Sequence, residues 1–227
     1  MKRPIATLLL GLIGAGILLS LGVWQMQRLA WKEGILDEIE STIAGPAQPL
    51  PQVVSPDEQR YQPLALSGTI EEGELHVLVS VKRVGAGYRV IAPFQTNDGR
   101  RVLLDRGFVP VAKKGTPRRT GPAEVTGNLH WPDDRNSSTP ENDVAGNTWF
   151  ARDIGPMSEA LQTEPLLVIA REVTPADPGL TPLPVDTSGI PNDHLQYAVT
   201  WFSLAAIWLA MTATLIWRQR RDTKGGR

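Results

Sequence analysis

The chain contains no cysteine, so no disulfide bond stabilises it and no thiol can act as a nucleophile or a soft metal ligand. It has only four methionines, which further argues against a copper site or an iron–sulfur cluster. The sequence also lacks a G-x-S-x-G nucleophile elbow, an H-E-x-x-H zinc motif and a phosphate-binding glycine loop. Nothing in it asks for catalysis, and we expect a protein that is not an enzyme.

Charged side chains are absent from two long apolar stretches, residues 4–27 and 195–217. About 20 apolar residues suffice to cross the ~30 Å hydrocarbon core of a bilayer as a helix. Each stretch therefore predicts a transmembrane helix, the first continuing to about residue 43. The alternative for the first stretch is a cleavable signal peptide, with Ser20 and Gly22 at a small-x-small site. The pattern favours a membrane hairpin that carries one extramembrane domain.

Basic residues lie outside both predicted spans, namely Lys2 and Arg3 at one end and a basic tail, residues 218–227, at the other. Because lysine and arginine are retained on the cytoplasmic side, both termini are predicted to face the cytoplasm or a mitochondrial matrix. The remainder of the chain holds 16 Lys and Arg against 23 Asp and Glu, a net charge of −7. An acidic domain of this kind argues against nucleic-acid binding.

The region between the spans, residues 44–191, is predicted to form a β domain on the periplasmic or intermembrane-space side. Its β-rich runs follow one another without helical patterns, which favours a mainly antiparallel sheet with a barrel-like or sandwich-like form. Roughly 150 residues are enough for one packed core. The runs are YQPLALSGTI, ELHVLVSV, GYRVIAPFQT, RVLLDRGFVPV, AEVTGNLHW, NTWFARD and PLLVIAREV.

Local signals refine this domain. The Asn97-Asp98-Gly99 segment lies between two apolar runs and predicts a tight hairpin whose turn needs positive φ angles. A short helix is predicted over residues 154–161. The proline-rich segments 46–56 and 174–191 are predicted to be extended connectors to the membrane.

Five segments form a recognisable series along the chain: LGVWQMQRLAWK, YQPLALSG, GYRVIAPFQTNDGRRVLLDRGFVP, PENDVAGNTWFARD and PNDHLQYAVTWFSLA. Together, and in this order, they resemble the surfeit locus protein 1 family of cytochrome c oxidase assembly factors. Phe108 stands where the family often has Trp, and Asp105 where Asn is common, but both exchanges keep the chemical character of the position.

The resemblance implies an assembly factor of the bacterial plasma membrane, or of the mitochondrial inner membrane, that assists delivery of heme a to oxidase subunit I. It implies subunit I, and in addition heme a synthase, as partners, with heme a as a transient cofactor. Two other classes stay open. One is a membrane scaffold that binds oxidase subunits without heme, and the other is a membrane-tethered sensor, although the short tails offer no folded output domain.

His194 is the sharpest candidate for chemistry, because it is the only histidine near a predicted span and imidazole is a standard axial ligand of heme iron. Tyr197 and Trp201 follow at i+3 and i+7, on the same helical face, and could flank a flat macrocycle. The alternative is structural: Asn192 or Asp193 caps the helix, and the aromatic residues belong to an interfacial belt.

Trp24, Gln25 and Arg28 sit at the corresponding depth on the first span. The two helix mouths could therefore form one polar pocket, to which Trp24 and Arg28 contribute cofactor contacts. Arg28 could instead pair with Asp193 in a purely structural role. The sequence does not separate these alternatives.

Within the β domain the candidates favour structure over chemistry. Asp105 and Arg106 lie in an otherwise apolar strand, where ionised groups need partners, so we expect a buried network rather than a docking site. Trp149 is expected to pack in the core. His76 and His130 are isolated and show no metal-ligand spacing.

Overall fold

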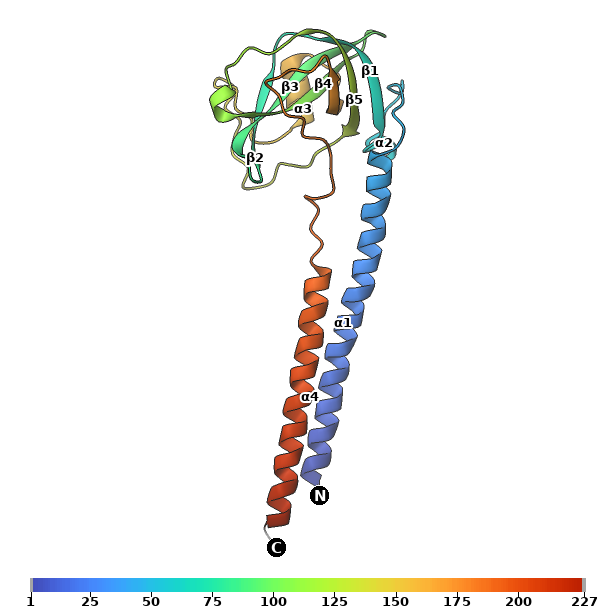
Figure 1. The fold of residues 1–227 in the computed structure, drawn as a ribbon, viewed down its shortest axis with the longest axis vertical. Coiled ribbons are helices and arrows are strands. Elements are labelled where there is room, and N and C mark those ends of the chain that lie inside the picture. The colour runs from blue at the N-terminus through green and yellow to red at the C-terminus, as the bar shows by residue number, and fades with distance from the viewer. Residues whose placement is uncertain (1, 226–227) are drawn as a thin grey trace. The chain divides into compact units, whose positions relative to one another are not determined.

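The computed structural model describes residues 2–225, and side chains are described for residues 5–221. It divides into two compact units. One unit contains the helices near the two chain ends, up to residue 38 and from residue 188 onward, and the other is Ile39–Thr187. Figure 1 shows both units and labels most of their elements.

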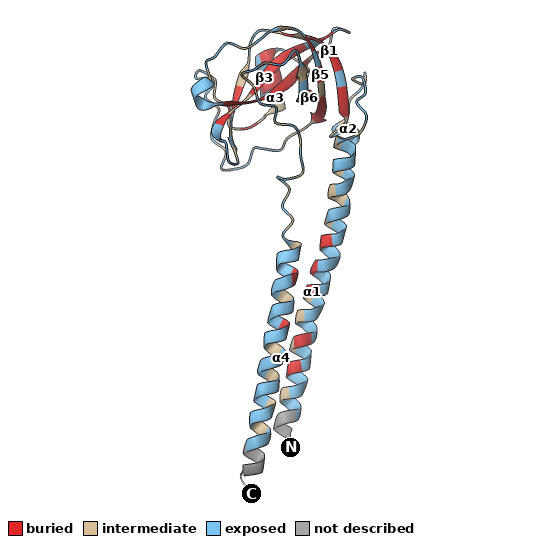
Figure 2. Ribbon diagram, in the orientation of Figure 1, coloured by how far each residue is buried: buried red, intermediate tan, exposed pale blue. Residues whose placement is uncertain are grey.

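The first unit is built from α1 (Lys2–Ile43) and α4 (His194–Gly225). By length and composition, Ile5–Ile43 and His194–Arg221 are candidate membrane spans. Most of their described residues are exposed, as the colouring in Figure 2 shows, and these include many large apolar residues, as lipid-facing surfaces require. The two predicted transmembrane helices are thus present, and α1 runs on well beyond its apolar stretch.

The two helices pack as an antiparallel pair. On α4 the least exposed positions recur at steps of four and three, which is the spacing of a coiled-coil seam. Small residues let the backbones approach: a Cβ added at Gly14 would lie 2.5 Å from the ring of Trp208. The indole Nε1 of Trp208 donates a hydrogen bond to the carbonyl oxygen of Gly11 at 2.9 Å. The α4 seam consists of His194, Ala198, Trp201, Ala205, Trp208 and Thr212.

The second unit is a six-stranded sheet in the order β1-β5-β6-β4-β3-β2. β1 also pairs with β3, so five of the strands close into a ring and β2 extends it beyond β3. All pairings are antiparallel except β4 with β6, which confirms the mainly antiparallel, barrel-like prediction. The strands are β1 (Pro63–Ile70), β2 (Leu75–Val81), β3 (Gly85–Thr96), β4 (Arg101–Pro110), β5 (Gly121–His130) and β6 (Leu167–Thr174).

The core of the β domain lies on both faces of its central strands, where Figure 2 shows the buried residues. Successive side chains of a strand point to opposite faces. On β4, Val102 and Leu104 join the larger cluster with Phe94, whereas Leu103 joins a second cluster with Met157 of α3 (Ile154–Leu161). Strands buried on both faces read as continuous apolar runs, which explains the sequence RVLLDRGFVP.

The predicted hairpin forms between β3 and β4. The amide of Thr96 donates to the carbonyl oxygen of Arg100 at 2.8 Å, and Gly99 has φ +90°. Only glycine among Asn97, Asp98 and Gly99 takes a positive φ, so the expectation of several positive φ angles in this turn is wrong. The loop is longer than a two-residue turn and needs only one such residue.

One predicted strand is absent from the described structure. The segment NTWFARD forms only isolated bridges, Val77 with Trp149 and Asp143 with Thr148. Asn147 has φ +46°, which turns the chain away from an extended path, so Trp149 touches the edge of β2 for a single residue. The α3 helix is confirmed, whereas two short elements, α2 (Pro56–Gln59) and η1 (Val111–Lys113), were not predicted.

Candidate functional site

His194 and Gln25 are in contact where α4 begins, and we call this end of the helix pair its mouth. His194 is the first residue of α4, and its ring Nδ1 lies 2.8 Å from Oε1 of Gln25 on α1. The Gln25 side chain is buried, with 8% of the residue exposed, whereas His194 is partly exposed. Among the described residues no protein group is hydrogen-bonded to the other ring nitrogen, Nε2, of His194. One side of the imidazole is therefore held and the other is open.

The remaining residues expected at this mouth are distributed unequally. Tyr197 and Trp24 are each more than half exposed. In an antiparallel pair, equal offsets from two contacting residues point to the same side of the pair. Tyr197 follows His194 by three positions and Arg28 follows Gln25 by three, so both turn toward the same side of the pair but lie in opposite directions along its axis. Trp201 instead lies in the seam between the helices.

Arg28 has a partner, but it is not the acid proposed for it. Its guanidinium lies over the ring of Trp31, 3.7 Å from the ring centroid. No ion pair joins Arg28 to Asp193 among the residues that the structure describes. The side-chain oxygen of Asn192 is buried without a hydrogen-bond partner, so Asn192 does not cap α4 through that oxygen.

The donor set at the mouth suits a heme iron. The ring of His194 offers a nitrogen to which no described protein group is hydrogen-bonded, and the exposed Tyr197 follows it by three positions on the same helix. A metal site made only of acids, histidines and cysteines is absent, because the described residues contain no group of three or more such side chains. A single histidine is one of the axial ligands that heme iron takes in proteins.

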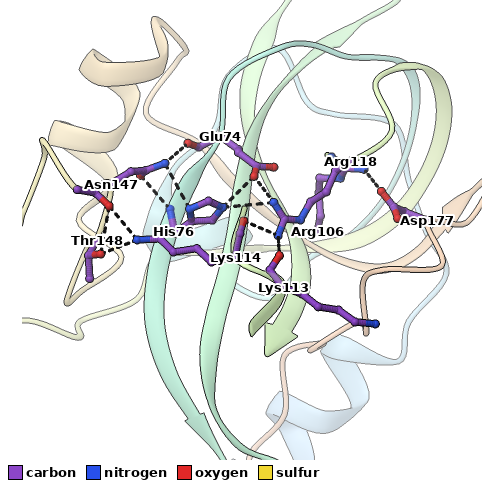
Figure 3. A network of polar contacts seen from close by, with 10 residues as sticks. Glu74, His76, Arg106, Lys113, Lys114, Arg118, Asn147, Thr148 and Asp177 are labelled. Atoms are coloured by element: carbon purple, nitrogen blue, oxygen red, sulfur yellow. Dashed lines mark hydrogen bonds and ion pairs between the residues drawn. The ribbon is translucent and has the colours of Figure 1, made fainter. Parts of the chain in front are cut away.

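A second polar centre lies in the β domain, shown in Figure 3. The ring Nε2 of His76 lies 2.8 Å from Oε1 of Glu74, and the same carboxylate accepts a hydrogen bond from Arg118. Asn147 reaches this pair from its loop: its Nδ2 donates to the carbonyl of Glu74 at 2.8 Å, and its Oδ1 accepts from the amide of His76 at 3.2 Å. The centre joins β2 to two loops.

The charged side chains of this centre have hydrogen-bond partners. Burial opposes ionisation of Glu74, but the hydrogen bond from His76 and the charge of Arg118 outweigh it and lower its pKa. Lys114 donates to the carbonyl of Gly146 and to Oγ1 of Thr148, both at 2.8 Å. Partners of this kind offset the desolvation of charged groups. We interpret the centre as a structural clamp that holds the loops against β2.

Asp105 and Arg106, which were expected to belong to a buried ionic network, do so. Asp105 is fully buried and pairs with Arg89 of β3, whose Nη1 lies 2.6 Å from Oδ2. Burial raises the pKa of Asp105, and the charge of Arg89 acts in the opposite direction. Arg106 pairs with Asp177 at 3.1 Å. Trp149, as predicted, is packed in the core.

Sequence reasoning did not single out the Glu74, His76 and Arg118 centre, because Arg118 is far along the chain from the other two residues. One signal was available: Asn147 lies in the PENDVAGNTWF segment, and asparagine tolerates the positive φ that it adopts there. The pairing of Gln25 with His194 was anticipated only as a shared polar pocket. Its hydrogen bond depends on how the two helices are rotated about their axes.

The architecture defines the class of protein: a membrane-anchored protein with two candidate membrane-spanning helices and one β-barrel-like domain. Comparison with known proteins identifies the family. The SURF1 family model matches residues 12–206, and the chain belongs to the SURF1 family.

Relatives with this family name come from animals and bacteria. The chain is 30% identical to Surfeit locus protein 1 of Xenopus tropicalis over 213 residues, covering 82% of this chain and 68% of the relative. It is 31% identical to Surfeit locus protein 1 of Homo sapiens, covering 82% and 70%. It is 29% identical to the SURF1-like protein of Rickettsia felis, covering 88% and 92%. Family membership implies a cytochrome oxidase assembly factor rather than a catalytic enzyme.

Proposed function

We propose that this protein holds heme a transiently and assists its insertion into subunit I of cytochrome c oxidase, while stabilising the early subunit I intermediate. His194 would be the axial ligand of the heme iron, and Tyr197, Trp201, Trp24 and Arg28 would surround the macrocycle. The observation that carries the proposal is the ring of His194, held through Nδ1 by Gln25 and open at Nε2. The heme, when bound, supplies the iron that later serves oxidase chemistry.

The surroundings of His194 support this role. Exposed Tyr197 and Trp24 offer flat apolar surfaces, and planar aromatic ligands stack favourably on such rings. Arg28 places a positive charge on the same side of the pair, where it could meet the propionate groups. Trp201 would contribute from the seam, seven positions further along α4 than His194.

The proposed setting is the plasma membrane of a bacterium, or the mitochondrial inner membrane, with both termini on the cytoplasmic or matrix side. The basic residues outside the two spans support this orientation. The proposed partners are subunit I and heme a synthase, because a transient carrier must meet both the source and the acceptor of its cargo.

Two experiments test the proposal, one on the purified protein and one in cells that lack it. The protein purified from cells that make heme a should show a heme absorbance band that is lost in His194→Ala but kept in His130→Phe, a change at a histidine of the β domain. Circular dichroism should show unchanged helix content in both variants. In cells lacking the protein, oxidase should be made at reduced yield and be deficient in heme, and His194→Ala should not restore it.

The outcomes separate the candidate functions. A band that persists in His194→Ala would show that another residue binds the iron. A wild-type protein without any band, in cells that make heme a, would favour a scaffold that binds oxidase subunits only. Normal heme occupancy and activity of the oxidase in cells lacking the protein would overturn the assembly role itself.

A further inference from the structure

We propose that Gln25 is a positioning residue that fixes the protonation pattern of the His194 ring. The amide oxygen of Gln25 would accept the Nδ1 proton, so that the lone pair of the ring resides on Nε2 and faces away from the helix pair. The part of this inference that concerns a bound iron rests on the proposed function. The part that concerns the hydrogen bond does not.

The contact itself is well defined. Nδ1 of His194 and Oε1 of Gln25 are 2.8 Å apart, a normal length for a hydrogen bond with a nitrogen donor. A carbonyl oxygen can only accept, so the proton of this bond must belong to the imidazole nitrogen. A neutral imidazole carries one ring proton. Nε2 is then the nitrogen with the free lone pair.

The burial of Gln25 distinguishes it from its neighbours on α1. Only 8% of Gln25 is exposed, whereas Gln27, two positions further along the helix, is exposed. A buried amide that lost its partner would be left without a hydrogen bond, which is unfavourable. The side chain of Gln25 therefore lies in the seam between the helices, where its hydrogen-bond partner is the imidazole of His194.

The packing around this bond limits how the ring can move. Leu29 follows Gln25 by one turn and Ala198 follows His194 by one turn, and both are buried in the helix pair. The imidazole is attached to the first residue of α4, where a free helix end would otherwise leave the ring to rotate. A bond to the neighbouring helix gives it one orientation.

This arrangement has a general chemical consequence. Histidines that bind metals usually donate their second ring N–H to an oxygen acceptor, which fixes the tautomer, orients the ring and raises the basicity of the ligating nitrogen. Loss of such an acceptor typically weakens metal affinity by about 10–100-fold. Gln25 supplies the acceptor here, so the ligand at position 194 is prepared before any iron arrives.

Two substitutions at Gln25 separate its possible roles. Gln25→Glu keeps an acceptor and cannot donate when ionised, whereas Gln25→Leu keeps the approximate volume and removes the acceptor. In titrations of the detergent-solubilised protein with hemin, we expect Gln25→Glu to retain affinity within about threefold and Gln25→Leu to lose about 10–100-fold. Gln27→Glu and Gln27→Leu are the matched controls and should behave as wild type.

Each other pattern overturns the inference. If Gln25→Leu binds hemin as wild type while Gln25→Glu fails, Gln25 only fills space. If both variants lose affinity equally, the amide acts as a donor to Nδ1, which requires the opposite tautomer. Circular dichroism and thermal unfolding of the full chain identify any variant that has simply lost its helix pairing.

Nuclear magnetic resonance of the protein without heme tests the tautomer directly. In the full chain labelled with ¹⁵N-histidine, the signal that disappears in His194→Ala belongs to this ring. At a pH where the ring is neutral, we expect a protonated Nδ1 and an unprotonated Nε2, and Gln25→Leu should shift the pattern toward a mixture. A protonated Nε2 in the wild type would refute the inference. This readout stands even if hemin does not bind, a result that would count against the proposed function alone.

Discussion

At the scale of single residues, burial changes the pKa of His130 in the β domain. His130 stacks on Tyr61 with ring centroids 5.4 Å apart, and its Nδ1 is buried without a partner. Burial lowers the pKa of His130 to about 4, and the nearby charge of Arg152 adds to this effect. The ring is therefore kept neutral in the folded protein, whereas an unfolded chain would protonate it near 6.5.

Substitution of His130 should make the β domain less sensitive to acid. Between pH 6.5 and 4 the unfolded chain binds a proton that the folded chain does not, so the free energy of unfolding falls as the pH falls. His130→Phe keeps an aromatic ring beside Tyr61 and removes the titration. We expect it to cancel a loss on the order of 2 kcal/mol, because one pKa unit corresponds to about 1.4 kcal/mol and solvent screens part of the effect.

The measurement is the free energy of unfolding of the full chain in detergent micelles, from urea titrations between pH 4.5 and 7. Other groups also titrate in this range, so the informative quantity is the difference between wild type and His130→Phe at each pH. That difference should move in favour of the variant toward acid. A difference that stays constant with pH would show that His130 does not control this part of the profile.

At the scale of elements, local patterns were sufficient where neighbouring residues decide the structure. The apolar stretches, the alternating strands and the helix over residues 154–161 follow from such patterns. The prediction of a strand over residues 147–153 was wrong. The composition of this segment is β-rich, but its pairing is set by the positive φ of Asn147 and by the edge of β2, which is far away in sequence. Likewise the parallel β4–β6 pair and the closure of β1 on β3 depend on non-local contacts.

The cost in unfolding free energy of replacing a glycine of the β domain by alanine should depend on its φ angle and on the atoms around it. Gly107 in β4 has φ +112°, and a Cβ there would meet the backbone of Pro182 at 2.8 Å. The segment it would displace is bonded to β4, since the amide of Phe108 donates to the carbonyl of Thr181 at 2.7 Å. Gly107→Ala combines strained backbone with overpacking, and we expect it to cost about 3 kcal/mol or more of unfolding free energy.

Two other glycines serve as controls for that measurement. Gly99→Ala meets the φ penalty alone, because nothing lies near its Cβ, and should cost about 1 kcal/mol. Gly115→Ala meets neither and should stay within about 0.5 kcal/mol of wild type. Urea unfolding of the three variants gives the order directly. Equal losses for Gly107→Ala and Gly99→Ala would mean that the Thr181 segment yields freely.

At the scale of the whole molecule, the sequence was sufficient to identify His194 as the candidate ligand but not to identify Gln25 as its hydrogen-bond partner. The position of His194 at the start of an apolar stretch is visible in the sequence, as are the aromatic residues at helical spacing from it. Its bond to Gln25 requires the rotation of both helices, which is set by many contacts such as those of Ala205 and Gly22. The same limit applies to Arg118, whose loop reaches Glu74 and His76 only in the folded domain.

Membrane orientation is the property of the whole chain on which the proposed site depends, and the absence of cysteine makes it directly measurable. Val144 is 69% exposed in the β domain and Arg220 is exposed near the end of α4, so either accepts a single cysteine label. In right-side-out membrane vesicles, a maleimide that cannot cross the bilayer should label Val144→Cys at once and Arg220→Cys only after permeabilisation, because basic tails are retained inside. Inverted vesicles should give the reverse order and so control for reactivity. Labelling of both sites from the same side in intact vesicles would mean that the helices do not both span the bilayer, and it would remove the basis for a heme site at the outer mouth of the pair.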